Sequence, residues 1–161
     1  MKRKSILAAA GFGGTVAAAA LLGARFNPAP GTATGRWYER QRKSPLNPPP
    51  AVFAPVWTTL YTAMTVAAYR VWRAPESRSR EAALRWWFAQ LGLNAAWSPL
   101  FFGLKQPEVS LVDLLALLAA QSAFVRKAND VDRPAALLFV PYLAWVLFAG
   151  YLNAEIVRRN R

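Results

Sequence analysis

The side chains of this sequence that could do chemistry are aromatic rings and amides. The chain has seven Trp, five Tyr and nine Phe, but no Cys and no His. Without Cys there is no thiolate chemistry, and without His there is no Ser-His or Cys-His catalytic pair. His is also the commonest metal ligand. The composition therefore predicts binding by ring stacking and amide hydrogen bonds, with no catalytic residue, no metal and no resident cofactor.

Aromatic and amide side chains recur at helical spacing in three apolar segments. At about 100° per residue, each set falls on one helix face and places rings beside a hydrogen-bonding group. The three stripes are Trp57, Tyr61, Met64 and Ala68; Gln90, Asn94, Trp97 and Phe101; and Tyr142, Trp145, Ala149 and Asn153. Aromatic stripes are often packing positions. Three convergent stripes, with the small Ala149 beside Trp145, also fit a pocket for a flat apolar ligand.

The segments that carry these stripes are long enough to cross a membrane, which needs roughly 20 helical residues. Hydrophobic residues make up 55% of the 161-residue chain, yet its formal net charge is +12. Apolar spans joined by Lys- and Arg-rich connections explain both values. The basic residues form no face of their own, so we expect no nucleic-acid partner.

The sequence thus predicts an all-α fold, an integral membrane bundle of five transmembrane helices in one domain, residues 1–161. The predicted helices are residues 5–26, 50–72, 82–104, 109–124 and 134–157, and residues 27–49 form a long first loop. We read Pro55, Pro99 and Pro141 as local bends within these helices. The basic, apolar and small-residue start also fits a cleavable signal peptide. We expect it to remain, because the other four helices would lose a partner.

Several features leave alternatives open. The first loop carries Arg36, Trp37, Tyr38 and Arg40, and it is either a lid over the bundle or an interfacial segment. Asp113 is either a functional intramembrane carboxylate or a charge near a helix start that pairs with a loop Arg.

A small-residue pair in the third predicted helix has its own implication. Gly92 and Ala96 are four residues apart and would allow two helices to approach closely, as in a homodimer. Lys and Arg are almost evenly divided between the two ends of the bundle. The orientation and the identity of the membrane therefore stay open.

Longer blocks of this sequence resemble the TspO/MBR family of tryptophan-rich sensory proteins, in the same order and over nearly the whole chain. The blocks are Trp37-Tyr38, residues 44–49 (SPLNPP), residues 53–57 (FAPVW), Leu93-Asn94 with Trp97, residues 101–103 (FFG), residues 111–113 (LVD), residues 141–145 (PYLAW) and Leu152-Asn153. The resemblance implies a five-helix bundle, usually dimeric, that binds porphyrins and other hydrophobic ligands beneath the first loop.

The resemblance also implies roles for single residues. Trp57, Asn94, Trp145 and Ala149 match positions that line the family's ligand site, and the two tryptophans match those linked to porphyrin photochemistry. The chain departs from some relatives at Ala95 and Val109, where those relatives have Trp. Ala154 stands where animal members have a cholesterol-recognition tyrosine, which puts sterol binding through that motif in doubt.

We therefore expect a multi-pass membrane receptor or regulator that binds a porphyrin or similar flat hydrophobic molecule. The predicted ligand-binding residues are Trp57, Tyr61, Asn94, Trp97, Tyr142, Trp145, Ala149 and Asn153, with Arg36, Trp37, Tyr38 and Arg40 from the loop. Loop arginines could pair with propionate groups. A transporter of porphyrin or lipid, and a light-dependent porphyrin-degrading enzyme, are the alternatives.

Overall fold

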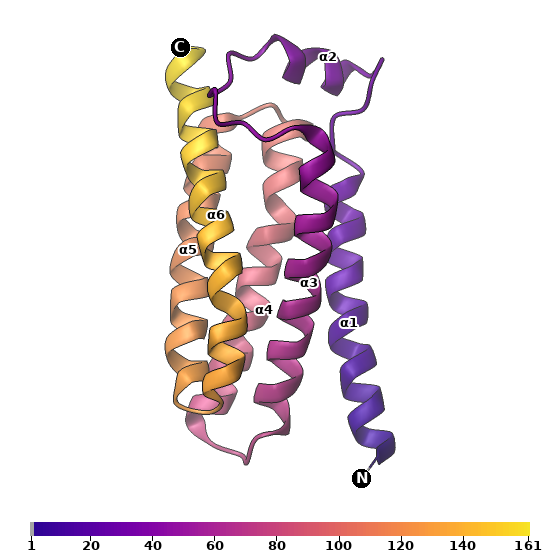
Figure 1. Cartoon of the computed structure of the whole chain (residues 1–161), viewed down its shortest axis with the longest axis vertical. Coiled ribbons are helices and arrows are strands. Elements are labelled where there is room, and N and C mark those ends of the chain that lie inside the picture. Colours follow the sequence, from indigo (N-terminus) through magenta and orange to yellow (C-terminus); the bar gives the residue numbers. More distant parts are fainter. Residues whose placement is uncertain (1) are drawn as a thin grey trace.

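The computed structural model describes residues 2–161, which form helices joined by short connections with no strand in that range. The elements are α1 (Lys2–Ala24), α2 (Ala33–Arg40), α3 (Pro50–Arg73), α4 (Arg78–Ser98), the π-helix η1 (Pro99–Gly103), α5 (Pro107–Asn129) and α6 (Arg133–Arg159). Five long helices run along the molecule, and α2 lies across one end (Figure 1). The predicted all-helical fold is confirmed.

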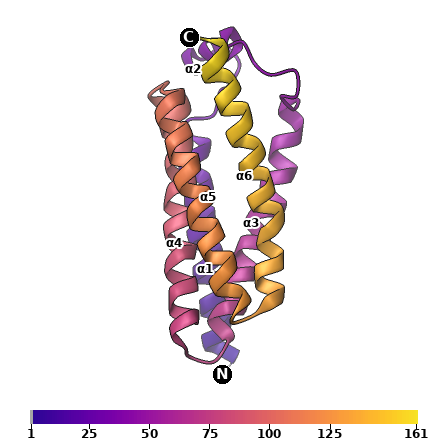
Figure 2. The ribbon, with the colours of Figure 1, turned by 90° about the vertical axis from the view of Figure 1, so that its left-hand side faces the viewer.

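The long helices surround a common interior in the order α1, α4, α5, α6 and α3, and each packs on its neighbours in this ring. Figure 2 shows α4 beside α5, with α6 and α3 on the other side. Because α3 and α4 make few direct contacts, the interior between them is free for side chains of α5 and α6.

Two predicted segments differ in kind from the structure, and the helix predicted as residues 109–124 is longer, spanning Pro107–Asn129. The loop 27–49 contains the short helix α2, whose N-cap Thr32 accepts the backbone N–H of Gly35 at 2.9 Å. The predicted helix 82–104 changes at Pro99 from α4 to η1. Proline has no N–H, so the carbonyl of Ala95 loses its regular helical bond. The turn that follows has the wider π pattern, in which the amide of Leu104 bonds the Pro99 carbonyl at 2.8 Å.

Within residues 2–161, four helices are long and apolar enough to cross a membrane, namely α1, α3, α5 and α6. The fifth long helix, α4, falls short of this measure. It begins with Arg78, Arg80 and Glu81 and carries Gln90 and Asn94 further along. The structure therefore supports a membrane protein. By length and composition, four of the five predicted spans qualify as membrane-crossing helices.

The core and the outer surface are both apolar, as expected for helices surrounded by lipid. Trp87, Phe124 and Phe139 are fully buried, whereas Leu115 and Leu147 are about 60% exposed. Several polar groups in the core bond to other parts of the protein, because lipid offers them no partner. The indole N–H of Trp87, for example, donates to the Met64 carbonyl of α3 at 3.1 Å.

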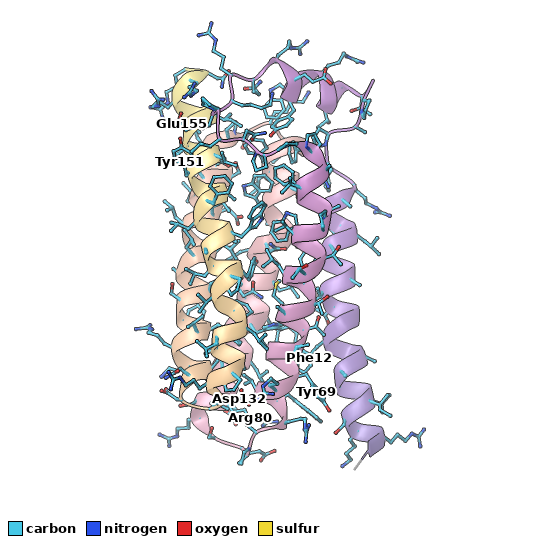
Figure 3. The ribbon with its side chains drawn as sticks, in the orientation of Figure 1. Phe12, Tyr69, Arg80, Asp132, Tyr151 and Glu155 are labelled. Atoms are coloured by element: carbon cyan, nitrogen blue, oxygen red, sulfur yellow. The ribbon has the colours of Figure 1, made fainter. Side chains whose placement is uncertain are left out.

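Asp132 joins the start of α6 to the end of α3. Its carboxylate accepts the backbone N–H of Ala135 at 2.8 Å as the N-cap of α6, and two bonds from Arg70 at 3.0 and 3.1 Å. Burial raises the pKa of Asp132, but the bonds from Arg70 and Ala135 outweigh it and hold this pKa below its usual value. Figure 3 shows Asp132 at the end of the bundle opposite α2.

Replacing Asp132 with alanine should lower the free energy of unfolding at neutral pH by about 1–2 kcal/mol, mostly through loss of the cap. Because the folded-state pKa lies below the unfolded value of about 3.9, this stability is present above that pH. It is lost as the pH falls through the folded-state pKa. Thermal unfolding in detergent at neutral and strongly acidic pH measures both effects. Asp130→Ala is the control, and an undiminished difference in acid would contradict the assignment.

Candidate functional site

A cavity of about 800 Å³ lies inside the bundle at the end covered by α2. All five long helices, η1 and the first loop contribute to its wall. Its aromatic lining residues are Tyr38, Phe53, Trp57, Tyr61, Trp97, Phe101, Phe102, Trp145 and Phe148. A cavity of this size, walled by rings with a few amides, is typical of a site for a hydrophobic small molecule.

The rings of the α3 and α6 walls support one another. The rings of Trp57 and Tyr61 lie 5.1 Å apart on α3, and Trp57 meets the edge of Tyr142 at 6.1 Å. Phe53 meets Trp145 of α6 at 6.0 Å in an edge-to-face arrangement. Because neighbouring rings hold each other in place, the wall presents fixed aromatic faces to the cavity.

Asn153 connects three helices at the cavity wall. Its Oδ1 accepts the Trp97 indole N–H of α4 at 3.3 Å and the Ser110 hydroxyl of α5 at 2.9 Å. Its Nδ2 donates to the carbonyl of Pro107 at 2.7 Å. Asn153 is 2% exposed, so these bonds form in a desolvated setting. They fix the ring plane of Trp97.

The first loop covers the open end of the cavity through Tyr38, Lys43 and Asn47. The Tyr38 hydroxyl donates to Asn47 Oδ1 at 3.4 Å, and burial raises the pKa of Tyr38, so it stays neutral. Lys43 Nζ lies 4.5 Å from the centre of the Tyr38 ring. Partial burial lowers the pKa of Lys43 from its ordinary value, and the nearby Glu39 opposes this change.

The loop is also fastened to the end of α6. The backbone N–H of Arg42 donates to Asn160 Oδ1 at 2.9 Å, and Asn160 Nδ2 donates back to the Arg42 carbonyl at 3.2 Å. Nearby, the hydroxyls of Ser44 and Tyr151 share a hydrogen bond of 3.2 Å. The loop therefore lies as a cover over the cavity in this structure.

Eight of the twelve predicted ligand-binding residues line the cavity. They are Tyr38, Trp57, Tyr61, Asn94, Trp97, Trp145, Ala149 and Asn153. The structure brings them together from α3, α4, α6 and the loop. Whether they contact a ligand remains a prediction at this point.

The other four predicted residues lie away from the wall. Tyr142 is fully buried below the cavity, because its stripe continues past the cavity floor. Trp37 packs against the edge of Phe101. Arg36 and Arg40 are exposed, and the Arg36 guanidinium donates to the Gly31 carbonyl at 2.6 Å. The α2 helix therefore turns these two arginines outward.

Sequence reasoning left several lining residues out of the predicted site. Phe53 lies one turn before Trp57 and extends the same stripe, so helical spacing could have found it. Lys43 is the cation on the wall within residues 2–161, yet nothing in the sequence distinguishes it from the neighbouring loop arginines.

Asp113 and the small-residue pair lie outside the cavity wall. Asp113 is buried in the second turn of α5, and within residues 2–161 no ion pair reaches it, so the predicted pairing with a loop Arg is absent. Gly92 is exposed on the outer face of α4, and a Cβ built there meets nothing within 4 Å.

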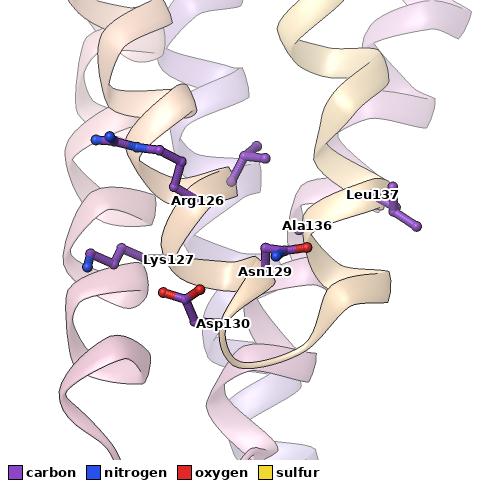
Figure 4. A pocket seen from close by; sticks show the side chains of 7 residues that line it. Arg126, Lys127, Asn129, Asp130, Ala136 and Leu137 are labelled. Atoms are coloured by element: carbon purple, nitrogen blue, oxygen red, sulfur yellow. The ribbon is translucent and has the colours of Figure 1, made fainter.

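A second hollow lies at the opposite end of the bundle, at the turn between α5 and α6 (Figure 4). Arg126, Lys127, Asn129 and Asp130 contribute to its lining. Its charged and amide side chains lie near the turn rather than around an enclosed apolar space. This hollow therefore lacks the ring faces that distinguish the first cavity.

Comparison with known proteins gives a consistent result. The chain matches the model of the TspO/MBR family over residues 12–159. It is 42% identical to the translocator protein of Bos taurus, over 87% of this chain and 82% of that protein. It is 37% identical to the tryptophan-rich protein TspO of Chlorobaculum tepidum, over 98% of both chains. It is 38% identical to the tryptophan-rich sensory protein of Cereibacter sphaeroides, over 77% of both.

Replacing Asn153 with leucine should lower the free energy of unfolding by about 1–3 kcal/mol, because the Trp97 indole N–H loses its partner in a buried setting. The change should also alter tryptophan fluorescence, since Trp97 loses its fixed orientation. Thermal unfolding and emission spectra in detergent measure the two effects. Asn129→Leu, at the exposed end of α5, is the control. Equal stability of the two variants would show that Asn153 does not hold the helices together.

Proposed function

Because this chain belongs to the TspO/MBR family, we propose that it is a membrane receptor or regulator that binds a porphyrin or another flat hydrophobic molecule in the cavity beneath the first loop. The observation that carries the proposal is the cavity itself. Its volume of about 800 Å³ lies within the roughly 300–1,000 Å³ typical of small-molecule sites. Tryptophan rings from α3, α4 and α6 face it, and each stacked ring adds about 0.5–1.5 kcal/mol beyond area burial.

The proposal includes α4 as a fifth membrane-crossing helix. It lies between α1 and α5, both of which are apolar enough to cross. Its interior polar residues do not face lipid, because Gln90 is buried and Asn94 lines the cavity. The mean hydropathy of α4 therefore underestimates how apolar its lipid-facing side is. Trp86 and Phe88 on that side are exposed.

Lys43 is the group that we propose to contact an acidic substituent of the ligand. It lies on the cavity wall, and it is partly withdrawn from water. A carboxylate meets a partly desolvated cation more strongly than a fully solvated one. Arg36 and Arg40, the residues that the sequence favoured for this contact, point away from the cavity.

Association into a homodimer is part of the same proposal. The outer face of α4 around Gly92 has room for a second helix, since among residues 2–161 no other part of the protein lies within 4 Å of a Cβ at this position. Small residues at a helix surface permit close approach within a bilayer.

One specific observation supports a second function, the light-dependent degradation of a bound porphyrin. Trp57 and Trp145 both lie on the cavity wall, on α3 and α6, where excited tetrapyrrole and indole could react. Product analysis of the porphyrin complex in light and in darkness separates degradation from simple binding. Transport of porphyrin or lipid would instead be seen as flux into sealed vesicles.

Trp145→Ala should weaken porphyrin binding by at least about tenfold, or about 1.4 kcal/mol, because it removes a ring face and the partner of Phe53. Titration with protoporphyrin IX, followed by tryptophan fluorescence in detergent, measures the affinity. Trp86→Ala removes a tryptophan from the outer face of α4 and is the matched control. An equal effect of the two variants would place the site outside the cavity.

Lys43→Met should weaken binding of protoporphyrin IX by about five- to tenfold, as expected for a lost contact between a carboxylate and a cation. It should leave the affinity for the dimethyl ester unchanged, because the ester has no charged oxygen. Arg40→Met is the control and should affect neither ligand. The affinities should be measured in zwitterionic detergent, where no anionic lipid competes for the loop. Equal losses for acid and ester would refute the assigned contact.

A further inference from the structure

Three buried polar side chains lie one helical turn below the cavity wall, on the side away from the loop. Residues four apart on a helix share a face, and each of the three is four residues from a lining residue. The pairs are Gln90 and Asn94 on α4, Gln121 and Leu117 on α5, and Tyr142 and Val146 on α6. The direction of each helix places the polar member deeper. The aromatic cavity therefore ends on a polar layer.

All three side chains are fully buried, and most of their polar atoms have no partner. Within the described residues, Gln90 Oε1, Gln121 Oε1, Gln121 Nε2 and the Tyr142 hydroxyl make no hydrogen bond. Gln90 Nε2 alone is satisfied, by the Trp87 carbonyl at 2.9 Å. A buried polar group without a hydrogen-bond partner destabilises the folded protein. Such a cluster in one place therefore indicates a missing partner.

These atoms face one another across the middle of the bundle. The Tyr142 hydroxyl lies near the side chains of Gln121, Tyr61, Asn94 and Asp113. Gln90 lies at the height of Gln121, since the two are 15 and 16 residues from Lys105 in the connection of antiparallel α4 and α5. The groups thus lie at one level of the bundle interior, and they do not bond one another directly.

We propose that Gln90, Gln121 and Tyr142 form a deep polar subsite below the aromatic cavity, which binds a neutral hydrogen-bonding group. Water fills this subsite when the cavity is empty, and a carbonyl or amide group of a ligand replaces it. The second half of the proposal rests on the proposed function, in that a hydrophobic molecule must occupy the cavity above.

The chemistry of the three residues defines what fits. Two amide oxygens accept, one amide nitrogen donates and the phenol can do either. A buried water needs two to four polar partners, and this group supplies them. None of the three side chains is charged, and the buried carboxyl of Asp113 near Tyr142 would disfavour an anion there. A ligand carbonyl could take the bonds of the water that it displaces.

The entrance to the subsite is the pair formed by Tyr61 and Asn94. Their hydrogen bond is long, at 3.4 Å, and both side chains also line the cavity. They are therefore placed to bond a molecule in the cavity on one side and the groups below on the other. A wholly apolar ligand has nothing to offer this pair. The subsite thus favours flat ligands that can turn a polar group toward this pair.

Two probes of nearly equal shape test the ligand half of the proposal. Benzanilide and trans-stilbene both join two phenyl rings by a flat two-atom link, which is an amide in one and a carbon–carbon double bond in the other. Direct binding of the tritiated probes in detergent gives both affinities. Gln121→Met should weaken benzanilide by about tenfold, or about 1.4 kcal/mol, and should change stilbene by less than about twofold.

Leu118→Met is the control, because it introduces the same methionine side chain at a neighbouring position of α5 outside the subsite and should affect neither probe. Tyr142→Phe removes only a hydroxyl and should act in the same direction as Gln121→Met. Equal losses for both probes, no loss for either, or no benzanilide binding by the unmodified protein would overturn the subsite as a ligand site. Failure to bind protoporphyrin IX, with the benzanilide effect intact, would refute only the porphyrin proposal.

A second measurement tests the proposed water in the subsite, first in the protein without ligand. Hydroxyl radicals made by a short X-ray pulse oxidise buried residues that touch bound water. Tyr142 should be oxidised faster than Phe139, which is equally buried and packs against it at 5.2 Å. The rate at Tyr142 should fall in Gln121→Met and when benzanilide binds. A rate as low as that of Phe139 in the ligand-free protein would overturn the proposed water.

Discussion

The hydrogen bonds of the Asn153 side chain determine how the aromatic residues of the cavity wall are placed. By holding the indole N–H of Trp97, Asn153 fixes the plane on which Phe101 stacks at 4.8 Å. Phe101 in turn receives the edges of Trp37 and Tyr38 from the loop. The same amide ties α6 to the start of α5. In lipid, no solvent can replace such a partner, so the position of the cover depends on a bond made inside the bundle.

The polar groups of the interior fall into two kinds, and the contrast suits a binding protein. Asn153, Ser110 and Trp97 satisfy one another and give a rigid frame at the upper wall. Gln121 and Tyr142, deeper in the bundle, are left with open bonds. If every buried polar group were bonded within the protein, the cavity would keep its shape but would have no free hydrogen-bonding group for a polar ligand. Without the bonds of Asn153, Gln121 and Tyr142 would be free to reorient and to pair with each other.

The sequence predicted the walls of the cavity better than its ends. Helical spacing gives the direction in which Trp57, Asn94 and Trp145 point, and all three line the cavity. It does not give depth, so Tyr142 was placed on the wall although it lies below it. The loop was harder still, because its path depends on Asn160, 118 residues away from Arg42. No local sequence pattern contains that contact. Which loop cation lies on the cavity wall, Lys43 or a neighbouring arginine, depends on it. The mean hydropathy of α4 likewise averages over its exposed side and its cavity side, so it does not show how apolar the exposed side is.

A molecule inside the cavity lies beneath a loop that the last turn of α6 holds in place. To leave toward water, it must wait until the two bonds between Arg42 and Asn160 and the contact of Ser44 with Tyr151 have broken. Under the proposed function, release would then be gated by the detachment of the loop, as in other lidded sites. Residence time can thus change at the C-terminal end of the chain without any change in the rings that hold the ligand. For a ligand bound as proposed, the bonds that hold the loop and the rings that hold the ligand would thus belong to separate parts of this fold.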